Sequence, residues 1–280
     1  MRLKTFLFLS VLTGLILTAG YYIGGRSGVS TALVLSAVIN LGTYWFSDKI
    51  VLAMYGAKSI LPEQNPQLYK IVTGLAKKMK IPTPKVYLVN LPVPNAFATG
   101  RNKEHAAVAV TPTILQMLNE KELEGVLAHE LSHVQNRDIL IGSIAATLAG
   151  TLSYIAQFAY YGMMLSGSND RNRRGNPIGG ILMLILTPLI ATLLNLAISR
   201  SREYLADETG AKILGNPDGL ASALLKLDAY SKAHPLFGQP RHQATAHLFI
   251  VNPFKASALL QLFSTHPPIE ERIKRLKNLG

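Results

Sequence analysis

Residues 129–133 read HELSH, near the middle of a chain of 280 residues. This stretch lies in a segment whose apolar residues recur at helical spacing, and Asn119 with Glu122 three residues later predicts a capping box where that helix begins. Histidines four residues apart lie one turn apart on one helix face, so both imidazoles can reach the same ion. Glu130 lies near that face and can take a proton from water at the ion. The stretch therefore predicts a metal site on a helix.

The sequence must supply a third metal ligand, because a catalytic zinc site needs three protein ligands and an open position for water. The chain has no cysteine, which leaves His, Asp or Glu as candidates. A third histidine at the metzincin spacing would fall near position 139, where the chain has Ile139. The stretch SREYLAD, residues 201–207, instead places Glu203 and Asp207 on one face of a later helix. Both carboxylates are candidate ligands.

Long uncharged stretches indicate a membrane protein. Only 16% of the residues are charged, against about 25% in a typical soluble protein. Four stretches without a charged side chain can cross a hydrocarbon layer of roughly 30 Å at 1.5 Å per residue. They are residues 5–23, 29–46, 139–165 and 178–199. The first resembles a signal peptide, but its length and the second apolar run that follows favour a retained hairpin.

The distribution of Lys and Arg predicts the orientation. Residues 47–138 and 200–280 carry eleven Lys and Arg each, so both blocks and both termini are expected in the cytoplasm. Arg171, Arg173 and Arg174, between the third and fourth apolar stretches, oppose this rule locally. They leave a re-entrant or interfacial hairpin as the alternative to two full spans.

The predicted organisation is one water-exposed domain interrupted by a membrane hairpin. Residues 1–47 form an N-terminal transmembrane hairpin, 48–138 the first part of the domain, 139–199 a second hairpin and 200–280 the second part. Glu203 lies four residues after the fourth apolar stretch, and His133 lies six residues before the third. Both are therefore expected at about the same height above the bilayer.

Composition excludes several other classes of protein. The absence of cysteine excludes a disulfide-built secreted domain and any Cys-ligated metal site. The net charge of +12 comes without a basic run with interleaved aromatics, so no nucleic-acid partner is expected. Excess Lys and Arg in a membrane protein is typical of loops that face anionic lipid.

Local patterns predict a mixed α+β domain. We expect helices after Asn65, after Thr111 and after Asn119, one from Asp218, and a last one after Pro268. A strand is expected at residues 85–89, a hairpin is expected from 96–99 and 106–110, and residues 231–243 are expected to form a loop.

Four stretches together resemble the HtpX family of membrane zinc metalloproteases. They are HELSH, SREYLAD, PNAFATG at residues 94–100 and STHPPIEERI at residues 264–273. The resemblance covers essentially the whole chain, including the number and order of the apolar stretches. It implies an integral membrane protein, mainly α, with four transmembrane helices and an α+β zincin-like domain of gluzincin type that the second hairpin splits. It also implies one Zn²⁺ per chain.

The resemblance also implies roles for individual residues. Zinc would be held by His129, His133 and Glu203, and Glu130 would act as general base. His266 would be a second catalytic residue, in contact with the transition state. The supporting residues that the resemblance implies are Asp207, which orients a ligand, and Arg272, which supports the site. The segment beside the cleft, where an edge strand can pair with substrate, contains Asn95, Ala96 and Phe97.

Four further histidines match no element of the family, and we expect them on the surface or in loops. They are His105, His234, His242 and His247.

The activity implied is endoproteolysis of misfolded or damaged membrane proteins at the cytoplasmic face of the plasma membrane, as part of stress-related quality control. The expected partners are polypeptide substrates, in particular membrane proteins, and the lipid bilayer. An intramembrane protease is disfavoured because charged residues such as Glu120 and Lys121 precede the motif. A prenyl protease of the CAAX type, which has more membrane spans, and a non-catalytic membrane chaperone or scaffold are the alternatives.

Overall fold

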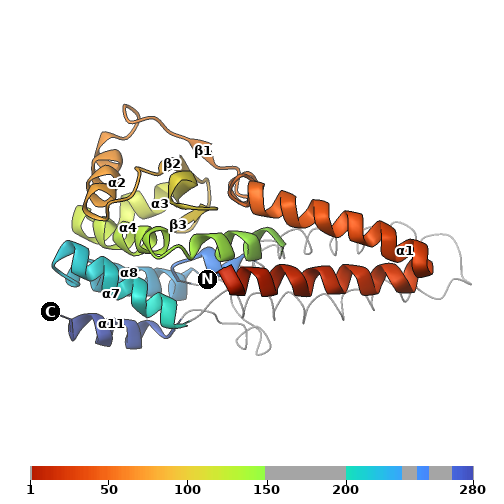
Figure 1. Cartoon of the computed structure of the whole chain (residues 1–280). Helices are drawn as coiled ribbons and strands as arrows, with labels where there is room; N and C mark the ends of the chain where they lie inside the picture. Colours follow the sequence, from red (N-terminus) through yellow and green to blue (C-terminus); the bar gives the residue numbers. More distant parts are fainter. Residues whose placement is uncertain (1, 149–199, 235–244, 252–266, 280) are drawn as a thin grey trace, which may run out of the picture.

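The computed structural model describes residues 2–148, 200–234, 245–251 and 267–279. A head of helices and a small sheet lies at one end, and a helical hairpin projects from it (Figure 1). The hairpin is α1 (Arg2–Met54), which Gly24 and Gly25 break by leaving helical geometry. Gly25 has φ of 58°, a left-handed conformation that glycine adopts without steric cost. The chain therefore turns back on itself between the first two apolar stretches, as predicted.

The two arms of α1 touch backbone to backbone near the turn. A Cβ added to Gly20 would lie 2.5 Å from the Cβ of Ala32 and 2.6 Å from the carbonyl oxygen of Gly28. A Cβ added to Gly28 would lie 2.0 Å from the carbonyl oxygen of Gly20. Because real Cβ atoms do not approach so closely, this contact requires glycine at positions 20 and 28. Small residues allow the same close packing between helices in lipid.

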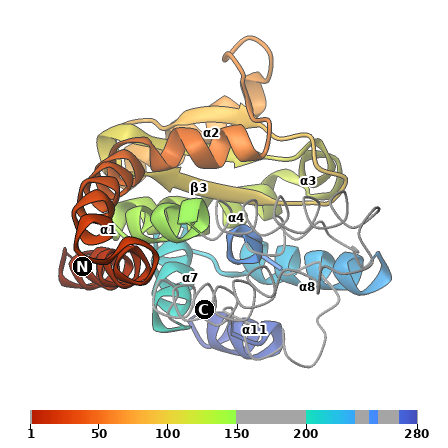
Figure 2. The same cartoon turned by 90° about the vertical axis from the view of Figure 1, so that its right-hand side faces the viewer.

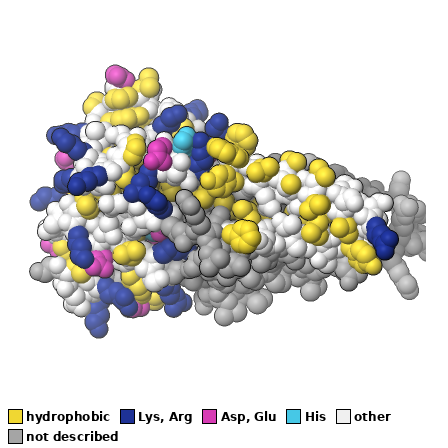
Figure 3. Space-filling view, viewed as in Figure 1, with side chains coloured by type: hydrophobic (Ala, Val, Ile, Leu, Met, Phe, Trp, Pro, Cys, Tyr) yellow, Lys and Arg dark blue, Asp and Glu magenta, His cyan; other side chains and the backbone are white. Residues whose placement is uncertain are grey.

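The second arm has the length and composition of a membrane span. Among the described residues, Gly24–Met54 is the one helix that meets both criteria, and Ile139–Leu148 is a shorter apolar helix. Figure 3 shows apolar side chains along the projecting hairpin, whereas charged side chains gather on the head. The exposed apolar side chains of this arm include Leu33, Val34, Leu35, Val38, Leu41, Tyr44, Trp45 and Phe46.

The third and fourth predicted spans, residues 139–165 and 178–199, lie mainly outside the described part of the chain. Residues 149–199, with Arg171, Arg173 and Arg174, lie outside the described part of the chain. Four full spans and the domain boundaries at 47, 138 and 199 therefore stay predictions.

The sheet of the head has the strand order β1-β2-β4-β3. β2 (Lys85–Leu88) runs parallel to β4 (Ala106–Val110), whereas β1 (Lys58–Ser59) and β3 (Ala96–Gly100) are antiparallel to their neighbours. The three predicted strands are thus confirmed. β3 is an edge strand, and η1 (Lys103–His105), a 3₁₀ turn, connects it to β4.

Besides the apolar helix Ile139–Leu148, six described α-helices belong to the head. They are α2 (Pro66–Lys78), α3 (Pro112–Met117), α4 (Glu120–Gln135), α7 (Arg200–Leu214), α8 (Asp218–Ala233) and α11 (Ile269–Lys277). All five helix starts predicted from the sequence are confirmed. The loop expected from residue 231 begins later, because α8 continues to Ala233.

α4 is the central helix of the head, between the sheet on one side and α7 and α8 on the other (Figure 2). Its predicted capping box is present: the Glu122 amide donates to Asn119 Oδ1 at 3.0 Å, and the Asn119 amide donates to Glu122 Oε2 at 2.9 Å. Gly210 lets α7 approach closely, since a Cβ there would lie 3.2 Å from the backbone nitrogen of His129. The first turn of α7 is thereby held beside the HELSH turn of α4.

Candidate active site

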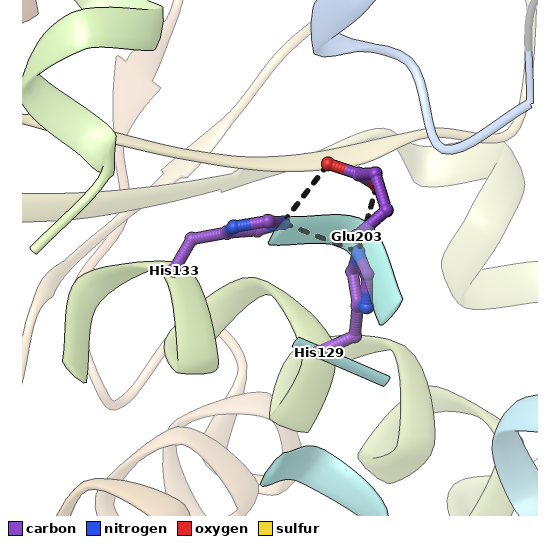
Figure 4. A group of neighbouring side chains, drawn as sticks. All are labelled: His129, His133 and Glu203. Carbon is purple, nitrogen blue, oxygen red and sulfur yellow. Dashed lines mark hydrogen bonds and ion pairs between the residues drawn. The ribbon is translucent and has the colours of Figure 1, made fainter. Parts of the chain in front are cut away.

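Three side chains from two helices converge in the head. His129 and His133 extend from α4, and Glu203 reaches them from α7 (Figure 4). The two Nε2 atoms lie 3.3 Å apart, and the Glu203 oxygens lie 3.6 Å from Nε2 of His129 and 3.7 Å from Nε2 of His133. Tetrahedral zinc with ligands at about 2.0–2.1 Å places those ligands roughly 3.4 Å apart. The geometry of these three residues, here called the triad, therefore fits a zinc ion.

The hydrogen bonds of the two imidazoles support the same conclusion. Nδ1 of His129 lies 2.8 Å from an oxygen of Asp207, and Nδ1 of His133 lies 3.1 Å from an oxygen of Asp138. These partners assign the proton of each neutral ring to Nδ1, so Nε2 presents a lone pair. Two lone pairs and a carboxylate then face one point, an arrangement that a cation stabilises.

The pKa values of the metal-free histidines reflect that need for positive charge. Burial disfavours the charged ring of His133, but the hydrogen bond and charge of Asp138 outweigh burial and raise its pKa to about 10. Burial likewise lowers the pKa of His129, but the hydrogen bond and charge of Asp207 more than offset burial, so this pKa is raised above its ordinary value. Protons therefore occupy the triad when no metal does, and a metal must displace them.

Asp207 is held in turn by Arg272 of α11. The Arg272 guanidinium is fully buried and donates through Nε at 2.8 Å and Nη2 at 2.7 Å to the two Asp207 oxygens. Burial would raise the pKa of Asp207, but Arg272 lowers it to about 2. The carboxylate is thus ionised and fixed in orientation, and it fixes the ring of His129.

Asp138 is a site residue that the sequence analysis missed. It comes after α4 has ended at its C-cap, Asn136, so helical spacing does not connect it with His133. Arg137 has φ of 61°, and this left-handed turn directs the chain back so that the Asp138 amide donates to the His133 carbonyl at 3.1 Å. An acidic residue two positions after the C-cap residue is the signal that was available in the sequence.

We expect Asp138→Asn to weaken zinc binding by roughly 10- to 100-fold, because the substitution removes the charge that orients His133 and raises its basicity. Competition with a chromogenic chelator measures the affinity. Asp228→Asn is the control, since Asp228 pairs with Lys232 on the surface of α8. Equal affinity for the two variants would contradict this role of Asp138.

Glu130 faces the same cleft from α4. Its side chain is buried, and its Oε2 accepts a hydrogen bond of 3.0 Å from the backbone amide of Ala98 in the edge strand β3. Burial raises the pKa of Glu130 above its ordinary value and outweighs the charges of His129 and His133, which lower it. A carboxylate with a raised pKa is a better proton acceptor and donor near neutral pH.

The cleft has walls from five parts of the chain. β3 contributes Phe97 and Ala98, the helix Ile139–Leu148 contributes its first turn, and α7 contributes Arg202 beside Glu203. Residues 247–250 complete the lining together with α4.

Phe97 lines this cleft, whereas Asn95 and Ala96 do not. The Asn95 side chain is buried, donates to the Leu248 carbonyl at 3.1 Å and accepts from the Ile250 amide at 3.1 Å. Ala96 is fully buried in the sheet. Asn95 thus holds the segment 245–251 against the cleft.

His247 differs from its predicted surface or loop position. It lies in η2 (Ala246–Leu248), is buried and lines the cleft, with Nε2 3.3 Å from the Gly142 carbonyl oxygen. The prediction was wrong because the contact of this segment with Asn95 is long-range. His105 and His234 are exposed as expected, whereas His242 and His266 lie outside the described residues.

Two imidazoles and a carboxylate at zinc spacing, with a buried glutamate and an edge strand in the same cleft, define a metallopeptidase. Comparison with known proteins agrees. The family model "Peptidase family M48" matches residues 62–279. The chain therefore belongs to peptidase family M48, among the HtpX proteases, and is a metalloprotease.

Relatives match along nearly their whole length. A protease HtpX homolog from Sulfurihydrogenibium sp. (strain YO3AOP1) is 52% identical over 286 residues, covering 100% of this chain and 96% of the relative. A protease HtpX homolog from Pyrococcus furiosus is 50% identical over 278 residues, covering 99% and 95%. The crystal structure of S. mikatae Ste24p shares the fold at a TM-score of 0.53 and 20% identity; the match covers 98% of this chain and 65% of the Ste24p chain.

Proposed function

We propose that this chain is a multi-pass membrane endopeptidase that binds one Zn²⁺ through His129, His133 and Glu203. It hydrolyses peptide bonds of misfolded or damaged membrane proteins at the cytoplasmic face, as part of quality control. The observation that carries the proposal is the position of Glu130, which shares a buried cleft with the triad and is bonded to the edge strand at Ala98.

The chain's own groups supply the proton transfers. When bound, zinc contributes Lewis-acid chemistry, which lowers the pKa of water and polarises a carbonyl. Glu130 accepts a proton from water as the water oxygen forms a bond to the scissile carbonyl carbon. As the C–N bond breaks, Glu130 gives that proton to the leaving amine. His129 and His133 keep their orientation through Asp207 and Asp138.

The edge strand supports recognition of extended polypeptide. A strand at the edge of a sheet can pair with a substrate backbone whatever its side chains are. Because the Ala98 amide lies 3.0 Å from Glu130, a peptide along β3 would pass the general base. Recognition through the backbone suits unfolded substrates of varied sequence.

The proximity of the cleft to the membrane boundary supports membrane-protein substrates. The Arg101 guanidinium lies 4.7 Å from the centre of the Trp45 ring, at the end of the apolar arm of α1. Aromatic residues of this kind mark the level of lipid headgroups. Ala98 precedes Arg101 by three residues, which is about 10 Å of extended chain. Polypeptide emerging from the bilayer would thus reach Glu130 readily.

We expect the purified full chain, in lipid nanodiscs, to cleave an unfolded membrane protein and to spare the same protein when folded. Removal of metal with a chelator should abolish cleavage, and added Zn²⁺ should restore it.

Reporter fusions at Gly28 and Gly100 test the orientation of the chain in the membrane, with Gly100 expected in the cytoplasm. Cleavage that persists after metal removal, or an external Gly100, would refute the proposal.

A further inference from the structure

Arg202 is a partly buried cation in the cleft, and two of its hydrogen-bond donors are unused. It lies on α7, next to Glu203, and lines the same cleft as Glu130. Its Nε and Nη2 atoms are buried and have no hydrogen-bond partner. No carboxylate of the described residues lies within 4.0 Å of the guanidinium, although Asp138 and Glu203 act on it through their charge.

This arrangement contrasts with that of Arg272. Arg272 is fully buried beside the triad, but its two-pronged ion pair with Asp207 leaves only Nη1 without a partner. Arginine stays charged at all accessible pH values, so burial of the Nε and Nη2 donors of Arg202 without a partner costs free energy in the substrate-free protein. Asp138 attracts the guanidinium through its charge but accepts no hydrogen bond from it, since one of its oxygens is bonded to His133 and the other has no partner.

Hydrogen-bond donors that lack a partner in a substrate-free cleft call for an explanation, and a substrate that accepts their hydrogen bonds provides one. The planar guanidinium presents directed N–H donors, and every residue of a bound polypeptide offers a carbonyl oxygen. An endopeptidase cleft therefore brings acceptors to Arg202 whatever the substrate sequence. A substrate C-terminal carboxylate offers the same oxygen chemistry with a full charge.

We propose that Arg202 binds a backbone carbonyl oxygen of the substrate beside the scissile peptide bond. The inference rests on the proposed endopeptidase function. Because this hydrogen bond exists in the bound substrate as well as in the transition state, Arg202 contributes mainly to substrate affinity. Glu130 and the triad perform the chemical step.

The test compares Arg202→Gln and Arg202→Lys with Arg200→Gln, which removes an exposed charge from the same helix two residues earlier. Two peptides of one sequence serve as substrates, one with a C-terminal amide and one with a free C-terminal carboxylate. A charge-assisted hydrogen bond is worth enough that kcat/KM should fall roughly 10- to 100-fold in Arg202→Gln. The loss should appear chiefly in KM, be equal for both peptides and be smaller in Arg202→Lys. Arg200→Gln should match the unsubstituted protein.

Binding measurements in a Glu130→Gln background complete the test. There Arg202→Gln should weaken binding of the uncleaved amide peptide by the same factor, with zinc content unchanged. Loss of zinc from Arg202→Gln would overturn the inference by showing a structural role, and unchanged kinetics would overturn it directly. A loss confined to the free-acid peptide would replace it with capture of the substrate C-terminus. Failure of the unsubstituted protein to cleave either peptide would instead count against the proposed function.

Discussion

Glu130→Gln is expected to lower the rate of peptide cleavage by roughly 10²- to 10⁴-fold while zinc remains bound. The carboxamide has nearly the same shape as the carboxylate, and its oxygen can still accept the hydrogen bond from the Ala98 amide. It cannot accept a proton from water near neutral pH, so proton transfer to the leaving amine is lost as well. Neither triad histidine loses a partner, because their Nδ1 atoms are bonded to Asp207 and Asp138.

Three measurements on this variant separate catalysis from folding. Turnover of an unfolded membrane substrate gives the rate, metal analysis gives the zinc content, and thermal unfolding gives the stability. Glu124→Gln is the matched control, because Glu124 lies on the same helix and its one ion pair within the described part of the chain is with Lys78, at 3.7 Å on the surface. Full proteolysis by Glu130→Gln would show that another group is the base.

Arg272→Met is expected to destabilise the head by about 3–5 kcal/mol, the usual cost of removing one partner of a buried ion pair. Met fills much of the same volume, but it leaves the buried Asp207 carboxylate without its two guanidinium hydrogen bonds. The pKa of Asp207 then rises from its value of about 2, since burial alone favours the neutral acid. The ring of His129 loses its fixed acceptor, and zinc affinity falls with it.

A second substitution distinguishes this mechanism from simple loss of packing. Arg272→Met combined with Asp207→Leu removes both buried charges, so the double variant should be more stable than Arg272→Met alone, although it still binds zinc weakly. Lys274→Met, on the exposed face of α11, should change the free energy of unfolding by no more than about 0.5 kcal/mol. If the double variant were the less stable, the cost of Arg272→Met would lie in packing.

Local sequence signals predicted the half of the site that lies on α4. The spacing of His129 and His133 and the capping box at Asn119 depend on residues within a few turns of one helix, and the structure has both features. Strand β3 and the start of α11 were likewise predicted from neighbouring residues. Such features follow from local geometry and need no knowledge of tertiary packing.

Contacts between distant segments were beyond sequence reasoning alone. Without the family resemblance, the sequence left both Glu203 and Asp207 as candidates for the third ligand. The choice between them depends on how α7 packs on α4, and that packing relies on a close approach at Gly210. The bonds from Asn95 to Leu248 and Ile250 join residues about 150 positions apart, so no periodicity predicts that His247 is buried. Asp138 was missed for a local reason, the left-handed turn at Arg137.

The residues of the site come from α4, α7 and α11, which are far apart in the sequence, and this affects when the site can form during synthesis. The ribosome makes the chain from its N-terminus, so His129 and His133 are synthesised well before Glu203, and Arg272 comes last. A nascent chain therefore lacks a complete set of metal-ligating residues until α7 has been synthesised. We expect the order of the helices to delay activity until translation has passed α11, which would protect the unfolded newborn enzyme from self-digestion.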